Sequence, residues 1–386
     1  MKFSARTAGF SLLAAAAVAA GFYFYQKPQV NAGAPAASAV SKDTPILPPD
    51  DATHARYAGS SSCKPCHEKE YAEWQKSNHG LAERNYQKDM DEKAFSPKRT
   101  LNHGKDSSET FLDADGVAKI LTRGLGNEKR AYPVVRVIGN DPLRQFLVPA
   151  PGNRLQTSDV SYDPHKNEWF DVYGEEEREP GDWGHWTGQG MNWNAMCAAC
   201  HNTRLRKNYN PASNSYRTDM AEMSVGCEAC HGPMKEHLEW QAKPPIGYDP
   251  VKKTPTDPTV KRQTKDQMLD TCGACHARRG EISGDLVPGD SFFDHFSLTV
   301  TDGTDTYHPD GQVRDENYEY ASFLSSKMHH MGVRCADCHN PHTGKRLFPD
   351  NMLCMRCHVG GTQPPATVVD PATHGHHKAG STGNDC

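Results

Sequence analysis

The chain is 386 residues long, which is enough for two domains or for one large irregular domain. Only 36% of its residues are hydrophobic and its mean hydropathy is −0.76, values too low for a conventional core of this size. The formal net charge of −5 argues against a nucleic-acid-binding protein, because such proteins carry a basic surface.

An apolar segment opens the chain. Lys2 and Arg6 precede an almost uncharged run over residues 8–25, which is about as long as a membrane span requires. Aromatic residues end the run, as at a membrane interface, whereas small residues nearby would suit signal-peptide cleavage. We therefore expect residues 1–27 to be a membrane anchor or a removed signal peptide. Residues 28–55, rich in Pro, Ala and Ser, are predicted to form a flexible linker.

Six Cys-x-x-Cys-His motifs follow, and we number them in chain order. With the 13 Cys and 20 His of this chain, a random order would give about 0.02 such motifs. Motifs 1 to 6 consist of Cys63/Cys66/His67, Cys197/Cys200/His201, Cys227/Cys230/His231, Cys272/Cys275/His276, Cys335/Cys338/His339 and Cys354/Cys357/His358.

This spacing is that of c-type haem attachment, in which two thiols bind the porphyrin edge and the adjacent imidazole becomes the proximal iron ligand. Structural zinc would not require a His after every Cys pair, and a disulfide framework places no demand on His. We therefore predict six covalent haem c groups. Their porphyrins would supply the apolar surface that the composition lacks. Covalent attachment of haem also suits an exported chain, in the periplasm or on the outer face of the cytoplasmic membrane.

The residues after motif 1 predict a helix over residues 68–95, with Tyr71 and Trp74 at helical spacing. His79 lies in Asn78-His79-Gly80, where the helical pattern weakens. A single His is usually a polar surface group. In a chain with six irons, however, we expect His79 to turn back onto a haem as an axial ligand.

Residues 105–175 contain no haem motif, and their pattern predicts strands. Residues 134–138 are rich in Val and Ile, and residues 145–148 and 154–162 flank a Pro- and Gly-containing turn. We expect a small β-meander that packs on the haem region and binds no cofactor. His165 lies in a turn of this segment and is predicted to be solvated.

The C-terminal half returns to helical patterns. After a linker rich in Pro, Lys and Thr over residues 243–260, Thr264 and Gln267 match a capping box that opens a helix into motif 4. An amphipathic helix is predicted over residues 316–331, and His329 and His330 at its end are candidate axial ligands.

Asn340-Pro341-His342 follows motif 5 directly. Because Pro stiffens this step, we expect His342 to bind a haem other than that of its own motif. Fourteen His lie outside the motifs, more than six irons need, so we expect mostly bis-His coordination. The 12 Met keep Met ligation open for one site.

The residues around these motifs resemble those of multihaem cytochromes of the cytochrome c-554 type. The resemblance rests on residues 181–188, Trp193-Asn194-x-Met196, Val225-Gly226, Gly232-Pro233, Ala277-Arg278-Arg279 and Tyr307-His308-x-Asp310-Gly311. The resemblance covers about residues 56–386. Within the family, the chain is most similar to larger exported members that often carry a tetratricopeptide-repeat segment after the haem region. The resemblance implies a mainly α fold with long irregular segments, built on stacked haems, with the β-meander as an insertion.

The resemblance also implies the distal ligands. Histidines in matching contexts are His79, His237, His308, His329, His342, His374 and His377. The repeat segment is absent here, which is one departure from the family. The other is the chain's end at Cys386, after a His- and Gly-rich stretch that resembles the approach to a further motif. We therefore expect the natural chain to continue and to carry a seventh haem.

The leading functional hypothesis is an exported electron carrier whose partners are other cytochromes or a membrane quinol-linked complex. An alternative is an oxidoreductase that acts on a small nitrogen or sulfur compound at one five-coordinate haem. The chain has no Cys-x-x-Cys-Lys variant, the commonest signature of ammonia-forming nitrite reductases. A third possibility is an anchored scaffold for a larger complex. No catalytic side chain is predicted.

Overall fold

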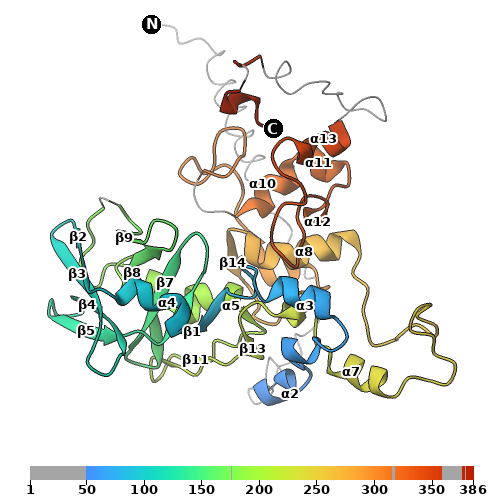
Figure 1. Cartoon of the computed structure of the whole chain (residues 1–386), viewed down its shortest axis with the longest axis horizontal. Helices are drawn as coiled ribbons and strands as arrows, with labels where there is room; N and C mark the ends of the chain where they lie inside the picture. Colours follow the sequence, from blue (N-terminus) through green and yellow to red (C-terminus); the bar gives the residue numbers. More distant parts are fainter. Residues whose placement is uncertain (1–48, 175, 315–317, 359–375, 379) are drawn as a thin grey trace, which may run out of the picture. The chain divides into compact units, whose positions relative to one another are not determined.

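The computed structural model describes residues 49–174, 176–314, 318–358, 376–378 and 380–386 (Figure 1). Residues Pro48–Cys386 form one compact unit. The predicted anchor and residues 28–48 of the predicted linker lie outside the described residues, whereas residues 50–54 of that linker form helix α2. In the part of the chain that is described, no helix is both long enough and apolar enough to cross a membrane.

The expectation of a mainly α fold is wrong, because the structure is 28% helix and 23% strand. Many of the described helices are a single turn or two, and α8 (Lys265–His276) has 12 residues. Pro or Gly ends some of these helices, as Pro97 does just after α4 (Lys88–Phe95) and Gly232 after α6 (Cys227–His231). The strands gather in a segment that is larger than the predicted meander.

This β-rich segment contains two antiparallel sheets, coloured cyan and green in Figure 1. The five-stranded sheet has the order β1-β6-β7-β8-β9 and the four-stranded sheet the order β2-β3-β4-β5. Their strands are β1 (Glu83–Asn85), β2 (Arg99–His103), β3 (Asp106–Leu112), β4 (Ala118–Arg123), β5 (Lys129–Pro133), β6 (Arg136–Ile138), β7 (Arg144–Ala150), β8 (Arg154–Asp163) and β9 (Glu168–Asp171).

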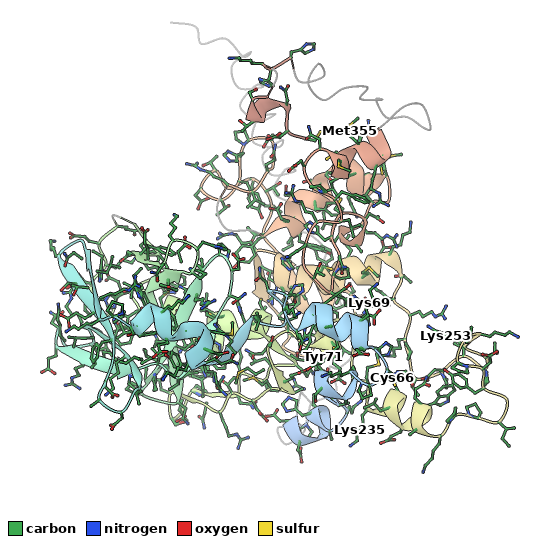
Figure 2. The ribbon with its side chains drawn as sticks, viewed as in Figure 1. Cys66, Lys69, Tyr71, Lys235, Lys253 and Met355 are labelled. Carbon is green, nitrogen blue, oxygen red and sulfur yellow. The ribbon has the colours of Figure 1, made fainter. Side chains whose placement is uncertain are left out.

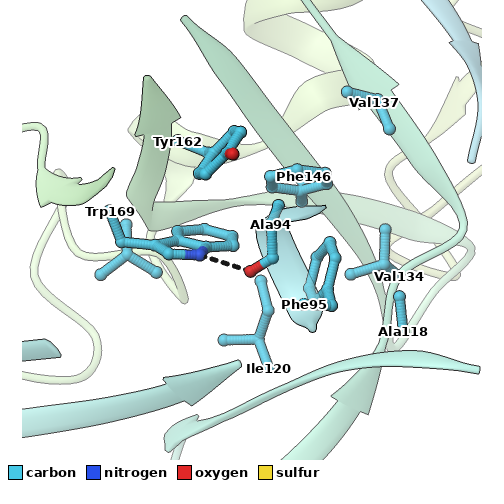
Figure 3. Close-up of a cluster of buried hydrophobic side chains, with 10 residues drawn as sticks. Ala94, Phe95, Ala118, Ile120, Val134, Val137, Phe146, Tyr162 and Trp169 are labelled. Carbon is cyan, nitrogen blue, oxygen red and sulfur yellow. Dashed lines mark hydrogen bonds between the residues drawn. The ribbon is translucent and has the colours of Figure 1, made fainter. Parts of the chain in front are cut away.

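Both sheets and helix α4 (Lys88–Phe95) enclose one hydrophobic core (Figure 3). Phe95 packs edge-on against Phe146 and Trp169, with ring centroids 4.9 and 5.5 Å apart. The Trp169 indole N–H donates to the carbonyl oxygen of Ala94 at 2.6 Å, which satisfies its polar group inside the core. Burial of each large aromatic ring contributes roughly 2–3 kcal/mol, so this segment has a core of its own without any cofactor.

The hairpin predicted around residues 149–153 is confirmed as β7 and β8. Gly152 and Asn153 take positive φ angles in its turn, a conformation that Gly and Asn adopt most readily. The segment nevertheless begins earlier than residue 105, because β1 pairs with β6 and places Glu83 opposite Ile138. A three-residue polar strand such as β1 leaves no alternating pattern in the sequence, so it was not predicted.

The single helix predicted over residues 68–95 is also wrong. Helix α3 (Glu68–Trp74) ends after two turns, and the hydroxyl of Ser77 donates to the Trp74 carbonyl oxygen at 2.7 Å. The Gly80 N–H in turn donates to the Ser77 hydroxyl at 3.1 Å, and a Cβ at Gly80 would clash with the Trp74 carbonyl. The resulting tight turn carries His79.

The remaining elements surround the Cys-x-x-Cys-His motifs. They are α2 (Asp50–His54), η1 (Ser60–Ser62), η2 (Gln189–Met191), η3 (Trp193–Cys197), α5 (Ala198–His201), β10 (Asn202–Thr203), β11 (Tyr209–Asn210), β12 (Ser215–Tyr216), β13 (Glu222–Met223), α6 (Cys227–His231), α7 (Lys235–Ala242), α8, β14 (Arg279–Glu281), α9 (Phe292–His295), β15 (Phe296–Leu298), α10 (Glu319–Ser325), α11 (Lys327–His330), α12 (Cys335–Cys338), α13 (Met352–His358) and η4 (Thr382–Asn384).

The capping box of Thr264 and Gln267 is confirmed at the start of α8. The helix predicted over residues 316–331 is divided into α10 and α11 at Ser326, whose side chain accepts a hydrogen bond from the His329 N–H. A second core cluster joins α8, α9 and α10 through Leu269, Phe292 and Tyr320.

The β-rich segment buries a polar pair beside its core. His185 Nε2 lies 3.7 Å from Asp159 Oδ2, and both side chains are almost fully buried. Burial raises the pKa of Asp159 to about 7, although the Trp186 N–H donates to this carboxyl and lowers it. Burial also lowers the pKa of His185 to about 4. A charged Asp159 is therefore a destabilising group at neutral pH and above.

We predict that Asp159→Asn stabilises the β-rich segment at pH 8 by about 1–3 kcal/mol and changes little at pH 4.5. A carboxyl with a raised folded-state pKa holds its proton more tightly in the folded than in the unfolded chain. Its stabilising contribution is therefore lost as pH rises from about 4 through about 7. Hydrogen exchange of the β8 amides at both pH values measures the effect.

Asp141→Asn is the matched control, because Asp141 pairs with His165 at 2.7 Å on the surface, where both side chains are more than half exposed. It should change stability by less than about 0.5 kcal/mol at either pH. Equal protection of β8 in wild type and Asp159→Asn at pH 8 would contradict the prediction.

Candidate haem sites and their axial histidines

Each motif that the structure describes lies on a short helical turn. In motifs 1 and 5, the His N–H donates to the carbonyl oxygen of the first Cys, at 2.9 Å for both His67–Cys63 and His339–Cys335. Positions i, i+3 and i+4 of a helical turn share one face, so both thiols and the imidazole of a motif are presented together. This is the arrangement that covalent attachment and proximal ligation require.

Three motif histidines face a histidine from a distant part of the chain. The ring centroids of His67 and His237 lie 6.5 Å apart, and those of His276 and His79 lie 6.2 Å apart. His231 of motif 3 stacks with His342 at 6.4 Å, with an angle of 21° between the ring planes. These contacts bring together residues separated by 111 to 197 positions.

The spacing of these pairs fits an iron between two imidazoles. A coordinating imidazole nitrogen lies about 2 Å from its metal and about 1 Å from the centre of its own ring. Two axial rings on one iron therefore have centroids about 6 Å apart, a separation that also lies within the range of about 4.5–7 Å found for ordinary ring contacts. The three pairs thus fit haem groups at motifs 1, 3 and 4.

The His237 ring is oriented by a carboxylate. His237 Nδ1 lies 2.7 Å from Asp257 Oδ2, which leaves Nε2 for a metal. Burial works against the charge of Asp257, but hydrogen bonds from Thr259 and His237 outweigh it and lower the Asp257 pKa. An ionised carboxylate on Nδ1 makes an imidazole a stronger metal ligand.

A backbone carbonyl orients the His79 ring. The Pro341 carbonyl oxygen accepts a hydrogen bond from the His79 ring, and burial outweighs this contact and lowers the His79 pKa. Burial likewise lowers the pKa values of His231 and His276, with smaller contributions from the histidines that face them. These rings are therefore neutral at physiological pH, the state in which imidazole binds a metal.

The Asn340-Pro341-His342 step serves two sites. The Asn340 side-chain oxygen accepts hydrogen bonds from the N–H groups of His342 and Thr343, at 2.9 and 3.3 Å, which fixes the turn. The turn places His342 against motif 3 while the Pro341 carbonyl orients His79 against motif 4. His342 therefore faces a motif other than its own.

The other candidate ligands occupy varied places. His201 Nδ1 contacts the Ala82 carbonyl oxygen at 2.9 Å, and His329 Nδ1 contacts that of Leu324 at 3.0 Å, so both keep Nε2 available. His308 is exposed in a turn, and its N–H donates to the Gln312 carbonyl oxygen. His377 is also exposed, whereas His374 lies outside the described residues. In the described part of the chain, no ring contact joins His201, His339 or His358 to a second imidazole.

Cysteines of different motifs lie in contact. Cys63 of motif 1 and Cys227 of motif 3 share a hydrogen bond, which raises the pKa of Cys63 and lowers that of Cys227 to about 7. The equivalent pairs are Cys200 with Cys275, joining motifs 2 and 4, and Cys272 with Cys335, joining motifs 4 and 5.

Weaker electrostatic contacts complete the order of the motifs. Cys230 of motif 3 contributes to the raised pKa values of Cys272 and Cys275, behind the thiol hydrogen bonds and burial. Burial raises the pKa of Cys338, and the nearby Asp337 and Cys357 raise it further. Cysteine contacts therefore join motifs 1 and 3, motifs 2 and 4, and motifs 4 and 5. Cys230 of motif 3 lies near Cys272 of motif 4, and the Arg356 guanidinium of motif 6 donates to the Asp337 carbonyl oxygen of motif 5 at 3.4 Å.

Two carboxylates, the buried Glu228 and the half-buried Glu222, fasten motif 1 to motif 3. Glu228, inside motif 3, accepts hydrogen bonds from the N–H groups of Ala58, Gly59 and Met234 at 2.7–3.0 Å. Glu222 accepts from the Ser60 N–H and hydroxyl, and the Ser60 hydroxyl accepts in turn from the Cys227 N–H. The approach to motif 1 is thereby held against the start of α6.

These supporting residues were not predicted from the sequence. Asp257 lies 20 residues after His237 in a segment interpreted as a linker, and no local pattern connects the two. Arg279 links motifs 2 and 4, because it donates to the Ala274 carbonyl at 2.6 Å and lies 3.8 Å from the Cys200 sulfur. Glu228 lies between the two cysteines of motif 3, and its charge at that position was a sequence signal that could have predicted a positioning role.

The comparisons with known proteins agree with this geometry. Residues 62–113 and 164–232 match the model of the family described as cytochrome c554 and c-prime. The fold is similar to that of the outer cell wall cytochrome OcwA, with a TM-score of 0.50 and 18% identity, over 79% of this chain and 67% of that chain. A search of curated proteins gives no match.

A second solved structure, the undecahaem cytochrome from the S-layer of Carboxydothermus ferrireducens, aligns with a TM-score of 0.41 and 18% identity, over 83% of this chain and 44% of that chain. The six attachment motifs, the family match and the fold shared with OcwA identify the chain as a multihaem c-type cytochrome. The family match contains motifs 1 to 3 and leaves out residues 114–163, which hold strands β4 to β8.

We predict that His342→Ala converts one low-spin haem to high-spin and leaves the number of covalent haems unchanged. The variant removes one imidazole of the His231–His342 pair but no attachment residue. Electron paramagnetic resonance of the oxidised protein measures the loss. His165→Gln is the control, because His165 pairs with Asp141 on the surface, and its spectrum should equal that of wild type. An unaltered His342→Ala spectrum would exclude His342 as an axial ligand.

A second prediction concerns the His237–Asp257 pair. Asp257→Asn should raise the reduction potential of one haem by about 30–60 mV while that haem stays low-spin, because a neutral amide makes the imidazole a weaker donor to ferric iron. Spectroelectrochemical titration measures the shift. Asp249→Asn, in the same loop but bonded to the Val251 N–H, should leave all potentials unchanged. Identical titrations of wild type and Asp257→Asn would contradict the orienting role.

Proposed function

We propose that this multihaem cytochrome is an exported electron carrier with mostly bis-His haems, and that electrons pass along its motifs in the order 1–3–4–5–6. Motif 2 forms a branch at motif 4. The observation that carries the proposal is the combination of facing imidazole pairs with contacts between cysteines of successive motifs.

The cysteine contacts support transfer between neighbouring groups. Sulfurs of motifs 1 and 3, and of motifs 4 and 5, lie within hydrogen-bonding reach. Since these sulfurs become the covalent attachments of adjacent porphyrins, the porphyrin edges of neighbouring motifs are brought close together. A haem supplies one-electron exchange at its iron when bound. The protein's task is to hold such groups close and in a fixed order.

The paired histidines determine what each site can do. His67 with His237, His231 with His342, and His276 with His79 would fill both axial positions of their irons. A six-coordinate site has no open position for a substrate, so these three sites suit electron transfer and exclude direct substrate binding. Bis-His coordination also favours lower potentials than Met/His coordination.

Export is supported by the chemistry of attachment and by the apolar run over residues 8–25. The similar fold of OcwA belongs to a cytochrome of the outer cell wall, according to its description. The partners are therefore redox proteins outside the cytoplasm, such as other cytochromes or a membrane quinol-linked complex.

One observation favours a second candidate function. His201 is oriented by the Ala82 carbonyl, and the described residues place no second imidazole in ring contact with it. A five-coordinate haem at motif 2 would bind a small nitrogen or sulfur compound. The branch position of motif 2 would let electrons reach such a site from motif 4.

We predict an intact mass that exceeds the polypeptide by six haems, with at least three of them low-spin by electron paramagnetic resonance. Fewer than three low-spin haems in fully loaded protein would contradict the proposed electron transfer through three bis-His sites. The same sample distinguishes the two functions. A high-spin signal that shifts on adding hydroxylamine or sulfite would favour the oxidoreductase, and its absence favours a pure carrier.

A further inference from the structure

The segment that follows α7 carries an unusual charge for this chain. Residues 243–262, which we call the basic loop, contain five basic and two acidic residues, whereas the whole chain has a net charge of −5. The basic residues are Lys243, Lys252, Lys253, Lys261 and Arg262, and all five are exposed.

The two acidic residues of the basic loop are occupied within it. Asp249 accepts hydrogen bonds from the N–H groups of Val251 and Lys252 at 2.9 and 3.2 Å. Asp257 is bonded to His237 and Thr259. The loop therefore presents mainly positive charge outward. Two apolar side chains accompany this charge, since Ile246 is 105% exposed and Val251 is 89% exposed.

Local contacts hold the basic loop in a defined shape. Tyr248 packs edge-on against Trp240 of α7, with ring centroids 5.1 Å apart. The Asp249 N–H donates to the Thr254 carbonyl oxygen at 2.9 Å, which closes the tip that carries Lys252 and Lys253. A surface fixed in this way loses less conformational entropy on binding than a flexible chain would.

The basic loop is connected to motif 1, which stands at one end of the order of motifs. Asp257 of the loop bonds His237, and His237 faces His67. Figure 2 labels Cys66, Lys69, Lys235 and Lys253, and the three lysines are exposed. Lys69 and Lys235 stand beside Glu68, Glu70 and Glu236, so the excess of positive charge lies in the basic loop itself.

From these observations we propose that the basic loop, which the Asp257–His237 bond connects to motif 1, forms the docking surface for an acidic redox protein, and that electrons enter or leave the chain there. The inference rests on the proposed function. One electron passes between the partner's redox cofactor and the haem of motif 1, so that one is oxidised as the other is reduced. The lysines attract the acidic partner over a distance, and the exposed Ile246 and Val251 supply short-range contact.

A redox protein fits this surface better than an anionic membrane does. Membrane-surface segments are commonly amphipathic helices with a continuous apolar face, whereas the basic loop is irregular and its exposed apolar residues are isolated. Its carboxylate also bonds the histidine that faces His67, so a partner seated on the loop lies next to an electron-transfer site. Lipid binding has no need of that proximity.

The test is stopped-flow reduction of the oxidised, haem-loaded protein by photoreduced flavodoxin, an acidic one-electron donor. We expect the second-order rate constant of wild type to fall at least tenfold when the salt concentration is raised from about 20 to about 300 mM. Salt at the higher concentration screens the attraction between the lysines and the acidic donor. Lys252→Glu/Lys253→Glu should be about tenfold slower than wild type at low salt. At high salt the two proteins should approach each other.

The matched control is Lys88→Glu/Lys166→Glu, which makes the same change of net charge at two exposed lysines of the β-rich segment. Its rate constant should stay within about twofold of wild type. Equal rates in both double variants, whether slowed or unchanged, would overturn the docking surface. So would loss of binding to phosphatidylserine vesicles in Lys252→Glu/Lys253→Glu together with an unchanged flavodoxin rate, because the loop would then be a lipid site.

Spin states and dithionite-reducible haem content, measured on the same samples, separate this inference from the proposed function. Both should be unchanged in Lys252→Glu/Lys253→Glu, so a slower rate reflects docking alone. If wild type itself lacked low-spin haems, the proposed function would fail. If wild type kept them and the rate did not depend on the loop, the docking surface alone would fail.

Discussion

The separation of about 6 Å between facing imidazoles is the constraint on which this structure depends. It matches the distance between the ring centres of two imidazoles bound to one iron, and three pairs of rings meet it. Each pair joins a motif to a histidine more than 100 residues away. The helices between the two rings of a pair are short, so these contacts connect distant segments that long helices or a continuous apolar core do not connect.

The β-rich segment obeys a different constraint. Its two sheets and α4 enclose Phe95, Phe146 and Trp169, a core made only of side chains. Much of the sparse apolar content of the chain is concentrated here, and the haem region is left to depend on porphyrin and on hydrogen bonds. This division explains how a chain with 36% hydrophobic residues can still form one compact unit.

Carboxylates do much of the positioning around the motifs. Glu228 and Glu222 accept backbone N–H groups at the approach to motif 1, and Asp257 orients His237. Glu228 is fully buried, and a buried carboxylate that lacks such donors would cost several kcal/mol, so Glu228 specifies one arrangement of the backbone around it. Asp257 belongs to the basic loop, so its bond to His237 places the loop next to the His67–His237 pair.

The sequence by itself determined the chemistry of attachment. Cys-x-x-Cys-His is a local pattern, and one helical turn presents its three side chains together whatever the rest of the fold does. The capping box at Thr264 and the hairpin at Gly152 were likewise local, and both are present. The sequence did not determine the balance of helix and strand. Short polar strands such as β1 exist only because β6 pairs with them.

Tertiary structure alone decided which histidines face which motifs and in what order the motifs lie. His79, His237 and His342 were candidates from their local contexts or from family resemblance, but their opposing rings come from other parts of the chain. His308 had an equally suggestive context and lies exposed in a turn. The physical reason is that axial pairing depends on a distance between two distant backbone segments, and no pattern within either segment records that distance.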